Sequence, residues 1–150
     1  MIRENIYSAV FAYWSGLTIG GNPAFKTATR KLTVWENVAA EDQPALLQLQ
    51  KSETVNKPKG LPARWVLSVE LYLYVHTGAS NDNSLIASQI LNPLLDAVEA
   101  AITIDDVMNS ACTLGGIVSH CYIDGAVEVF EGNLGDQAAC IIPITVVVPT

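Results

Sequence analysis

The sequence has no lysine or arginine after Arg64, although more than half of its 150 residues follow that position. All eight basic residues and five acidic ones lie at or before Arg64, whereas residues 65–150 hold ten acidic residues. The formal charge is therefore +3 for the first part, −10 for the second and −7 in total. Since nucleic-acid readers carry a basic face, sequence-specific binding of DNA or RNA is not expected. Oppositely charged parts suit head-to-tail self-association, with solubility alone as the alternative role of the charges.

Cysteine and histidine are also scarce. Cys112, Cys121 and Cys140 lack the C-x-x-C spacing of zinc and redox sites and leave one residue over for any disulfide pairing. A reducing compartment is the simplest interpretation. His76 and His120 are the only histidines, which leaves little material for histidine-based metal chemistry. We expect neither a metal nor a cofactor.

Motifs of the common enzyme classes are missing. The chain contains no H-E-x-x-H, G-x-S-x-G, dinucleotide-binding or phosphate-loop pattern, and the pairs in "IGGN" and "LGGI" are interpreted as turns. The amino-terminal stretch is too short and too polar to span a bilayer and lacks the basic region of a secretory signal. These observations predict a soluble, non-secreted protein that is not an enzyme and has no membrane partner.

One stretch, "SHCYID" at residues 119–124, does hold catalytic residue types. Its surroundings alternate between apolar and polar residues, which is typical of a strand. Because successive strand side chains point to opposite faces, His120 points away from Ser119 and Cys121. A base must reach the proton that it removes, so no Ser-His or Cys-His pair is expected within the segment. We interpret Cys121 as a core residue and place His120, with Asp124, on the wetter face.

Periodicity along the chain predicts seven elements. They are a helix over 2–17, strands over 27–35, 45–54 and 64–77, a helix over 84–102, and strands over 117–131 and 138–148 joined by "GNLGDQ". This order, α-β-β-β-α-β-β, predicts one α+β domain over residues 1–150. Its sheet should be mainly antiparallel, with about five strands covered by two helices.

Details within these elements carry further expectations. In the strand 64–77 every odd position from Trp65 to Val75 is apolar, so a helix should cover that face. The apolar stripe of 84–102 keeps its phase across Pro93, which favours one kinked helix. Gly125 indicates a bulge in its strand, and Pro143 indicates an edge strand or a bulge.

The segment "KSETVNKPKGLPAR", residues 51–64, stands out by charge. Half of all basic residues lie in it, namely Lys51, Lys57, Lys59 and Arg64, together with two prolines and a glycine. The pattern predicts a long, mobile, positively charged hairpin arm between two strands. It serves either as a docking element or as a solvated turn.

Three segments resemble a known family. They are "LPARWVLSVELYLYVHTG", "ILNPLLDAVEAAI" and "LGGIVSHCYIDGAVEVFEGNLGDQAACIIPITV". In length, element order and phrasing, nearly the whole chain resembles the tail-completion or tail-terminator proteins of long-tailed bacteriophages and prophages, the minor tail protein U type. The family has no catalytic motif to match.

The resemblance implies a virion protein at the neck-proximal end of the tail, made in the host cytoplasm. Such subunits form a ring, usually of six, that ends growth of the tail tube and presents a surface for the head connector. The implied partners are the chain itself, the tail tube protein and head-tail connector proteins. The basic arm would contact a neighbour or the tube. An acidic ring or lumen surface, past which the genome travels without sticking, would include Glu70, Glu128, Glu131 and Asp136.

Two alternatives stay open. A head-closure or head-tail joining protein of the neck would share the size and the setting but bind the portal side. A small cytoplasmic enzyme or ligand-binding domain would use His120, Asp124 or Cys112 in a cleft with converging polar groups.

Overall fold

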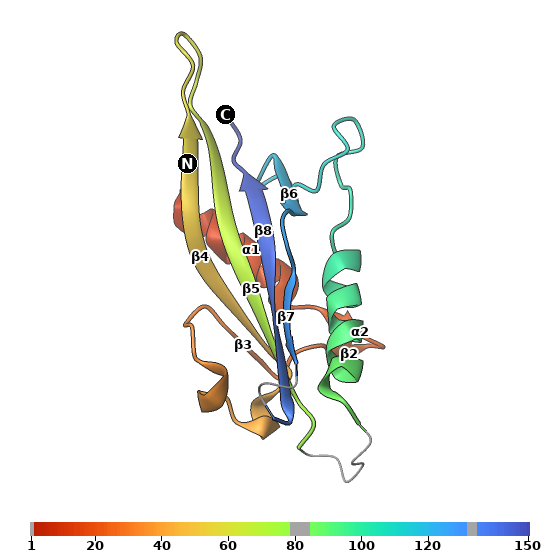
Figure 1. Ribbon diagram of the computed structural model, residues 1–150. Helices are drawn as coiled ribbons and strands as arrows, with labels where there is room; N and C mark the ends of the chain where they lie inside the picture. The colour runs from red at the N-terminus through yellow and green to blue at the C-terminus, as the bar shows by residue number, and fades with distance from the viewer. Residues whose placement is uncertain (1, 79–84, 132–134) are drawn as a thin grey trace.

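The computed structural model describes residues 2–78, 85–131 and 135–150 (Figure 1). Its elements in chain order are α1 (Arg3–Ser15), β1 (Thr18–Ile19), β2 (Asn22–Pro23), β3 (Thr27–Thr29), the 3-10 turns η1 (Trp35–Asn37) and η2 (Ala40–Asp42), β4 (Ala45–Asn56), β5 (Arg64–His76), α2 (Ala87–Ala100), β6 (His120–Ile123), β7 (Glu128–Glu131) and β8 (Gln137–Val147). The fold is α+β, as predicted. Position 84 of the predicted second helix and positions 132–134 of the predicted last hairpin lie outside the described residues.

The main sheet has six strands, in the order β3-β4-β5-β8-β6, with β7 also paired to β8. Every pairing is antiparallel except that of β3 with β4, which is parallel. The strand predicted over 27–35 is shorter in the structure and ends at Thr29. Beyond it the chain folds over the sheet, where Trp35 and Val38 pack beside Tyr74. Burying the indole there replaces continued pairing along β4.

The predicted strand over 117–131 is divided into β6 and β7, which both pair with β8. The division lies opposite Pro143, whose carbonyl accepts a hydrogen bond from the Asp124 amide at 3.2 Å. The N–H that proline lacks would point to the same side as that carbonyl, so the ladder breaks here. Gly125, with φ of +115°, carries the chain past the Pro143 ring. The predicted interruption is confirmed, but β8 is a central strand, so the edge position considered for Pro143 is wrong.

Both helices cover one face of the sheet. The core joins α1, through Val10 and Trp14, and α2, through Leu91 and Val98, to the odd-numbered apolar side chains of β5. Figure 1 shows α1 crossing behind β4 and β5. Residues 87–100 form a single helix that contains Pro93, in agreement with the continuous helix that was predicted. No helix in the described parts of the chain is long and apolar enough to cross a membrane.

The opposite face of the sheet, which we call the open face, carries the even-numbered side chains of β5. No described helix covers it. A small second cluster lies at one end, where Ala45, Leu47, Tyr74 and Ala139 are buried beneath the segment that holds Trp35. Apart from the exposed Arg64, the remaining side chains of this face on β5 and β8 are half-buried, because only neighbouring side chains cover them.

Candidate interaction site

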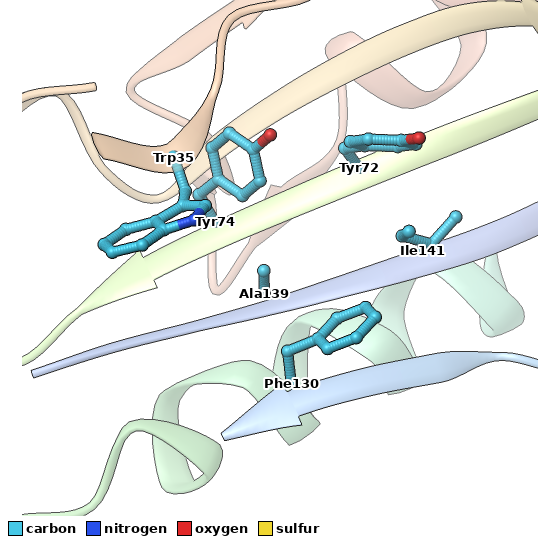
Figure 2. A pocket seen from close by; sticks show the side chains of 6 residues that line it. All are labelled: Trp35, Tyr72, Tyr74, Phe130, Ala139 and Ile141. Carbon is cyan, nitrogen blue, oxygen red and sulfur yellow. The ribbon is translucent and has the colours of Figure 1, made fainter. Parts of the chain in front are cut away.

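An aromatic groove lies at one end of the open face (Figure 2). Strand register places Tyr74, Ala139 and Phe130 in one row across β5, β8 and β7, and Tyr72 and Ile141 in the next. With Trp35 these residues line a hollow of about 230 Å³. Small-molecule sites commonly occupy roughly 300 to 1,000 Å³, so the groove suits a few side chains of a partner better than a cofactor.

The two tyrosines of the groove are held by hydrogen bonds. The Tyr74 hydroxyl donates to the carbonyl of Thr33 at 2.9 Å, and the Tyr72 hydroxyl donates to Glu70 Oε2 at 3.0 Å. Their rings meet edge to face, with centroids 6.5 Å apart. Burial and then the neighbouring Glu70 raise the pKa of Tyr72 to about 12, so its phenol stays a protonated donor at neutral pH. Phe130 remains 41% exposed and forms an accessible wall of the groove.

Acidic side chains border the groove. Glu70 and Glu128 lie on the open face near Tyr72, and their charges help to raise its pKa. Lys51 Nζ lies 3.5 Å from Glu70 Oε1. Glu128 makes no ion pair with any residue that the structure describes. This part of the open face therefore combines apolar surface with unneutralised negative charge.

The other two residues of the expected acidic surface lie elsewhere. Glu131 is in register with Ala138, a residue of the helix-covered core, and its Oε1 accepts a hydrogen bond from the Ser88 amide at 3.4 Å. A carboxylate is favourable there, in the first turn of α2. Asp136 precedes β8, and its carbonyl accepts from the Thr77 amide. The structure thus brings together only Glu70 and Glu128 of the four.

The basic arm is shorter and more regular than predicted. Residues 51–56 belong to β4, so only residues 57–63 form the loop between β4 and β5. At its tip the Leu61 amide donates to the Pro58 carbonyl at 3.1 Å, and Gly60 has φ of +80°, the geometry of a type II turn. The arm is therefore a projecting ribbon with a defined turn, visible at the top of Figure 1. The hairpin arm is thus present, but its loop is shorter than the predicted 51–64.

The four basic residues assigned to the arm separate into two groups. Lys51 lies beside the bulge of β4, near Glu70 on the sheet. Lys57, Lys59 and Arg64 are exposed at the far end and make no ion pair within residues 2–78, 85–131 and 135–150. Leu61 lies among them and is 62% exposed. The arm tip thus combines free positive charge with an exposed apolar side chain.

The segment that holds Ser119, His120 and Cys121 behaves as the alternation predicted. Cys121 is buried in the core, while His120 stacks on Tyr122 at 4.7 Å on the other face. His120 Nδ1 accepts a hydrogen bond from the Cys112 amide at 3.1 Å. Burial raises the pKa of the Cys121 thiol to about 12, which keeps it protonated. In the described part of the chain, no three His, Cys, Asp or Glu side chains gather to hold a metal.

A second projecting segment, residues 103–116, lies at the same end of the molecule as the arm (Figure 1). Asp105 accepts hydrogen bonds from the Gly115 and Thr113 amides, which lower the pKa of its carboxyl. At its turn Val107 is 81% and Met108 96% exposed. Local sequence patterns do not reveal which apolar residues of such a loop stay uncovered.

Local patterns do not predict the aromatic groove. The two-residue period puts Tyr72 and Tyr74 opposite the apolar face of the strand 64–77. Trp35, however, falls within the predicted strand 27–35, and Phe130 within the predicted strand 117–131, and periodicity does not give the neighbours of either strand.

Comparison of the chain with protein-family models finds no match, and a search of curated proteins finds none either.

Proposed function

We propose that the chain is a structural virion protein of the tail-terminator type. Copies of it form a ring on the last ring of a phage tail tube, end tube polymerisation and present a docking surface for the head connector. The observation that carries the proposal is the uncovered sheet face, whose aromatic groove is open to a partner. The same subunit projects a basic arm.

The chemistry of the open face supports a protein partner. An antiparallel sheet that faces water usually presents polar side chains there. This one presents Tyr72, Tyr74, Ile141 and Phe130 around a hollow. Apolar surface rimmed by polar groups marks interaction sites on soluble proteins. The absence of a converging polar cluster in this groove favours assembly over catalysis.

The distribution of charge supports a repeating contact between different surfaces. The free positive charges of Lys57, Lys59 and Arg64 lie at one end of the sheet. The aromatic groove, with Glu70 and Glu128 at its border, lies toward the other end. When one surface meets a different surface of the next copy, the contact repeats and closes into a ring if the rotation allows. Acidic residues turned to the lumen would keep the genome from adhering.

In this proposal the projecting segment 103–116 contacts the tube or the head connector. Its exposed Val107 and Met108 offer apolar contact area at the end of the molecule that also carries the arm. A ring of copies would present one such segment from every subunit on the same side. That repetition matches the symmetry of a tube end.

The test polymerises a long-tailed phage tube protein with and without this chain. We expect shorter tubes that carry the protein at one end only, and loss of this effect in the variant with Val107→Asp and Met108→Asp. Tubes of unchanged length, bare at both ends, would contradict the proposal. Antibody labelling of virions separates a terminator, found on the tube, from a joining protein, found on the portal side.

A further inference from the structure

We infer that the basic arm of one copy docks into the aromatic groove of the next copy. Leu61 and the adjoining prolines would enter the groove, and Lys57 and Lys59 would lie beside Glu128 and Asp124, which make no ion pair with a described residue. The inference rests on the ring proposed above and names the contact that joins its subunits.

The shapes and chemistries of the two surfaces match. The arm tip reads "KPKGLP", and its Pro58, Leu61 and Pro62 are all exposed. A segment whose shape is fixed before binding loses little conformational entropy when it docks. The type II turn at Gly60 holds the tip in a defined shape in the free protein. A hollow of about 230 Å³ suits a few such side chains.

The charges of the two surfaces are complementary. Lys57 and Lys59 make no ion pair with a described residue, and the same holds for Glu128 and Asp124. The Asp124 amide bonds to Pro143, which is in register with Glu70, so Asp124 lies level with Glu70 along the sheet. Bringing these groups together would neutralise both sets. Complementary charges steer the encounter and fix the orientation of the docked arm.

A chain cannot fill its own groove. The arm adjoins Arg64, whereas the groove lies at Tyr74, ten residues farther along β5, or about 33 Å at roughly 3.3 Å per residue. Figure 1 shows β5 running from the arm at one end to η1 and η2 at the other, with no reversal. The arm that fills a groove therefore belongs to another copy. Because donor and acceptor surfaces lie at opposite ends, each copy can give one arm and receive one.

The test is photo-cross-linking between two distinguishable copies. One copy carries Phe130→p-benzoylphenylalanine, which keeps an aromatic ring in the groove wall, and the other is uniformly labelled with nitrogen-15. Mass spectrometry then identifies cross-links between copies. The matched control carries the same group at Ile19, which is also 41% exposed but lies on the small β1-β2 hairpin.

We expect the Phe130 probe to cross-link to residues 57–62 of the labelled copy and the Ile19 probe not to do so. A labelled copy with Leu61→Asp should reduce the cross-link by about tenfold, because the charged side chain resists burial in the groove. Circular dichroism checks that this exposed change leaves the fold intact. Cross-links that map elsewhere, or none at high protein concentration, would overturn the inference.

The outcomes separate this contact from the tail function. If the arm cross-links to the groove but the protein leaves tubes uncapped, the subunit contact stands and the terminator function falls. If the protein caps tubes but the Phe130 probe never reaches the arm, the function stands and the arm docks elsewhere, for example on the tube.

Discussion

At the scale of single residues, Glu53 joins the first helix to the sheet. Its carboxylate accepts from Arg3 Nε at 2.8 Å and from the Tyr7 hydroxyl at 3.0 Å. Arg3 also lies 5.0 Å above the ring of Trp65. Hydrogen bonding to Arg3 lowers the pKa of Glu53, and burial raises that of Tyr7 to about 12. The cluster places a charge network beside the base of the arm, because Glu53 and Trp65 lie on the strands that carry it.

This cluster predicts an acid-dependent loss of stability. A lowered pKa in the folded chain means that Glu53 contributes fully above its ordinary value of 4.5, and that the contribution is lost as the pH falls through the folded pKa. Glu53→Gln should therefore flatten the decline in the free energy of unfolding below pH 4.5, measured by urea denaturation. Glu36→Gln, at an exposed glutamate, should leave the decline unchanged. Parallel curves for the wild type and Glu53→Gln would contradict the prediction.

Individual side-chain orientations were predictable wherever the strand was identified. The alternation that set Cys121 apart from His120, and Leu71 apart from Glu70 and Tyr72, follows from the two-residue period alone. Trp35 was not predictable in this way. Its local pattern is that of a strand, but the indole is better buried when the segment folds over the sheet. Tertiary contacts, which the local pattern does not contain, decide this conformation.

At the scale of elements, the helices and the long strands followed from periodicity, but their neighbours did not. The break at Gly125 and the special position of Pro143 could be read from residue chemistry. The central place of β8 could not, because it pairs along its length with β5, whose partner residues lie far away in sequence. The same long-range pairing places Tyr74 and Phe130 on either side of Ala139 and so creates the groove.

The turn of the arm gives a prediction at this scale. Gly60 has φ of +80°, and an added Cβ would meet no atom within 4 Å, so the cost of a side chain is conformational rather than steric. Gly60→Ala should lower the free energy of unfolding by about 1 kcal/mol. Lys59→Ala, at the preceding turn position, should have little effect. Chemical denaturation of both variants tests this, and equal stabilities would show that the turn relaxes without strain.

At the scale of the whole molecule, the division of charge was predictable and its spatial form was not. Counting residues placed the positive charge before Arg64 and the negative charge after it. The fold then places the unpaired positive charges of the arm tip at one end of β5 and the acidic border of the aromatic groove toward the other. Arg3, Arg30 and Lys51 are paired within the chain, so fewer basic residues are available to a partner than the count indicated.

Reversing the arm charges should weaken self-association. The double variant Lys57→Glu and Lys59→Glu would place acidic side chains against the acidic border of the aromatic groove of the next copy. The matched control, Lys26→Glu and Lys31→Glu, changes the net charge equally and also alters exposed lysines. Sedimentation velocity over a range of concentrations should show weaker association for the arm variant only. Equal weakening of both would indicate a general charge effect without a specific arm contact.

The most direct test of the central claim, a ring of identical subunits, is the native mass of the purified protein by light scattering at low and high salt, followed by negative-stain imaging. We predict closed rings at low salt, with about 97 kDa for six copies of the 16.1 kDa chain. Salt should loosen these rings, since it screens the exposed charge pairs between neighbours. A monomer at every salt concentration and every protein concentration, with no ring on a tube end, would contradict the claim.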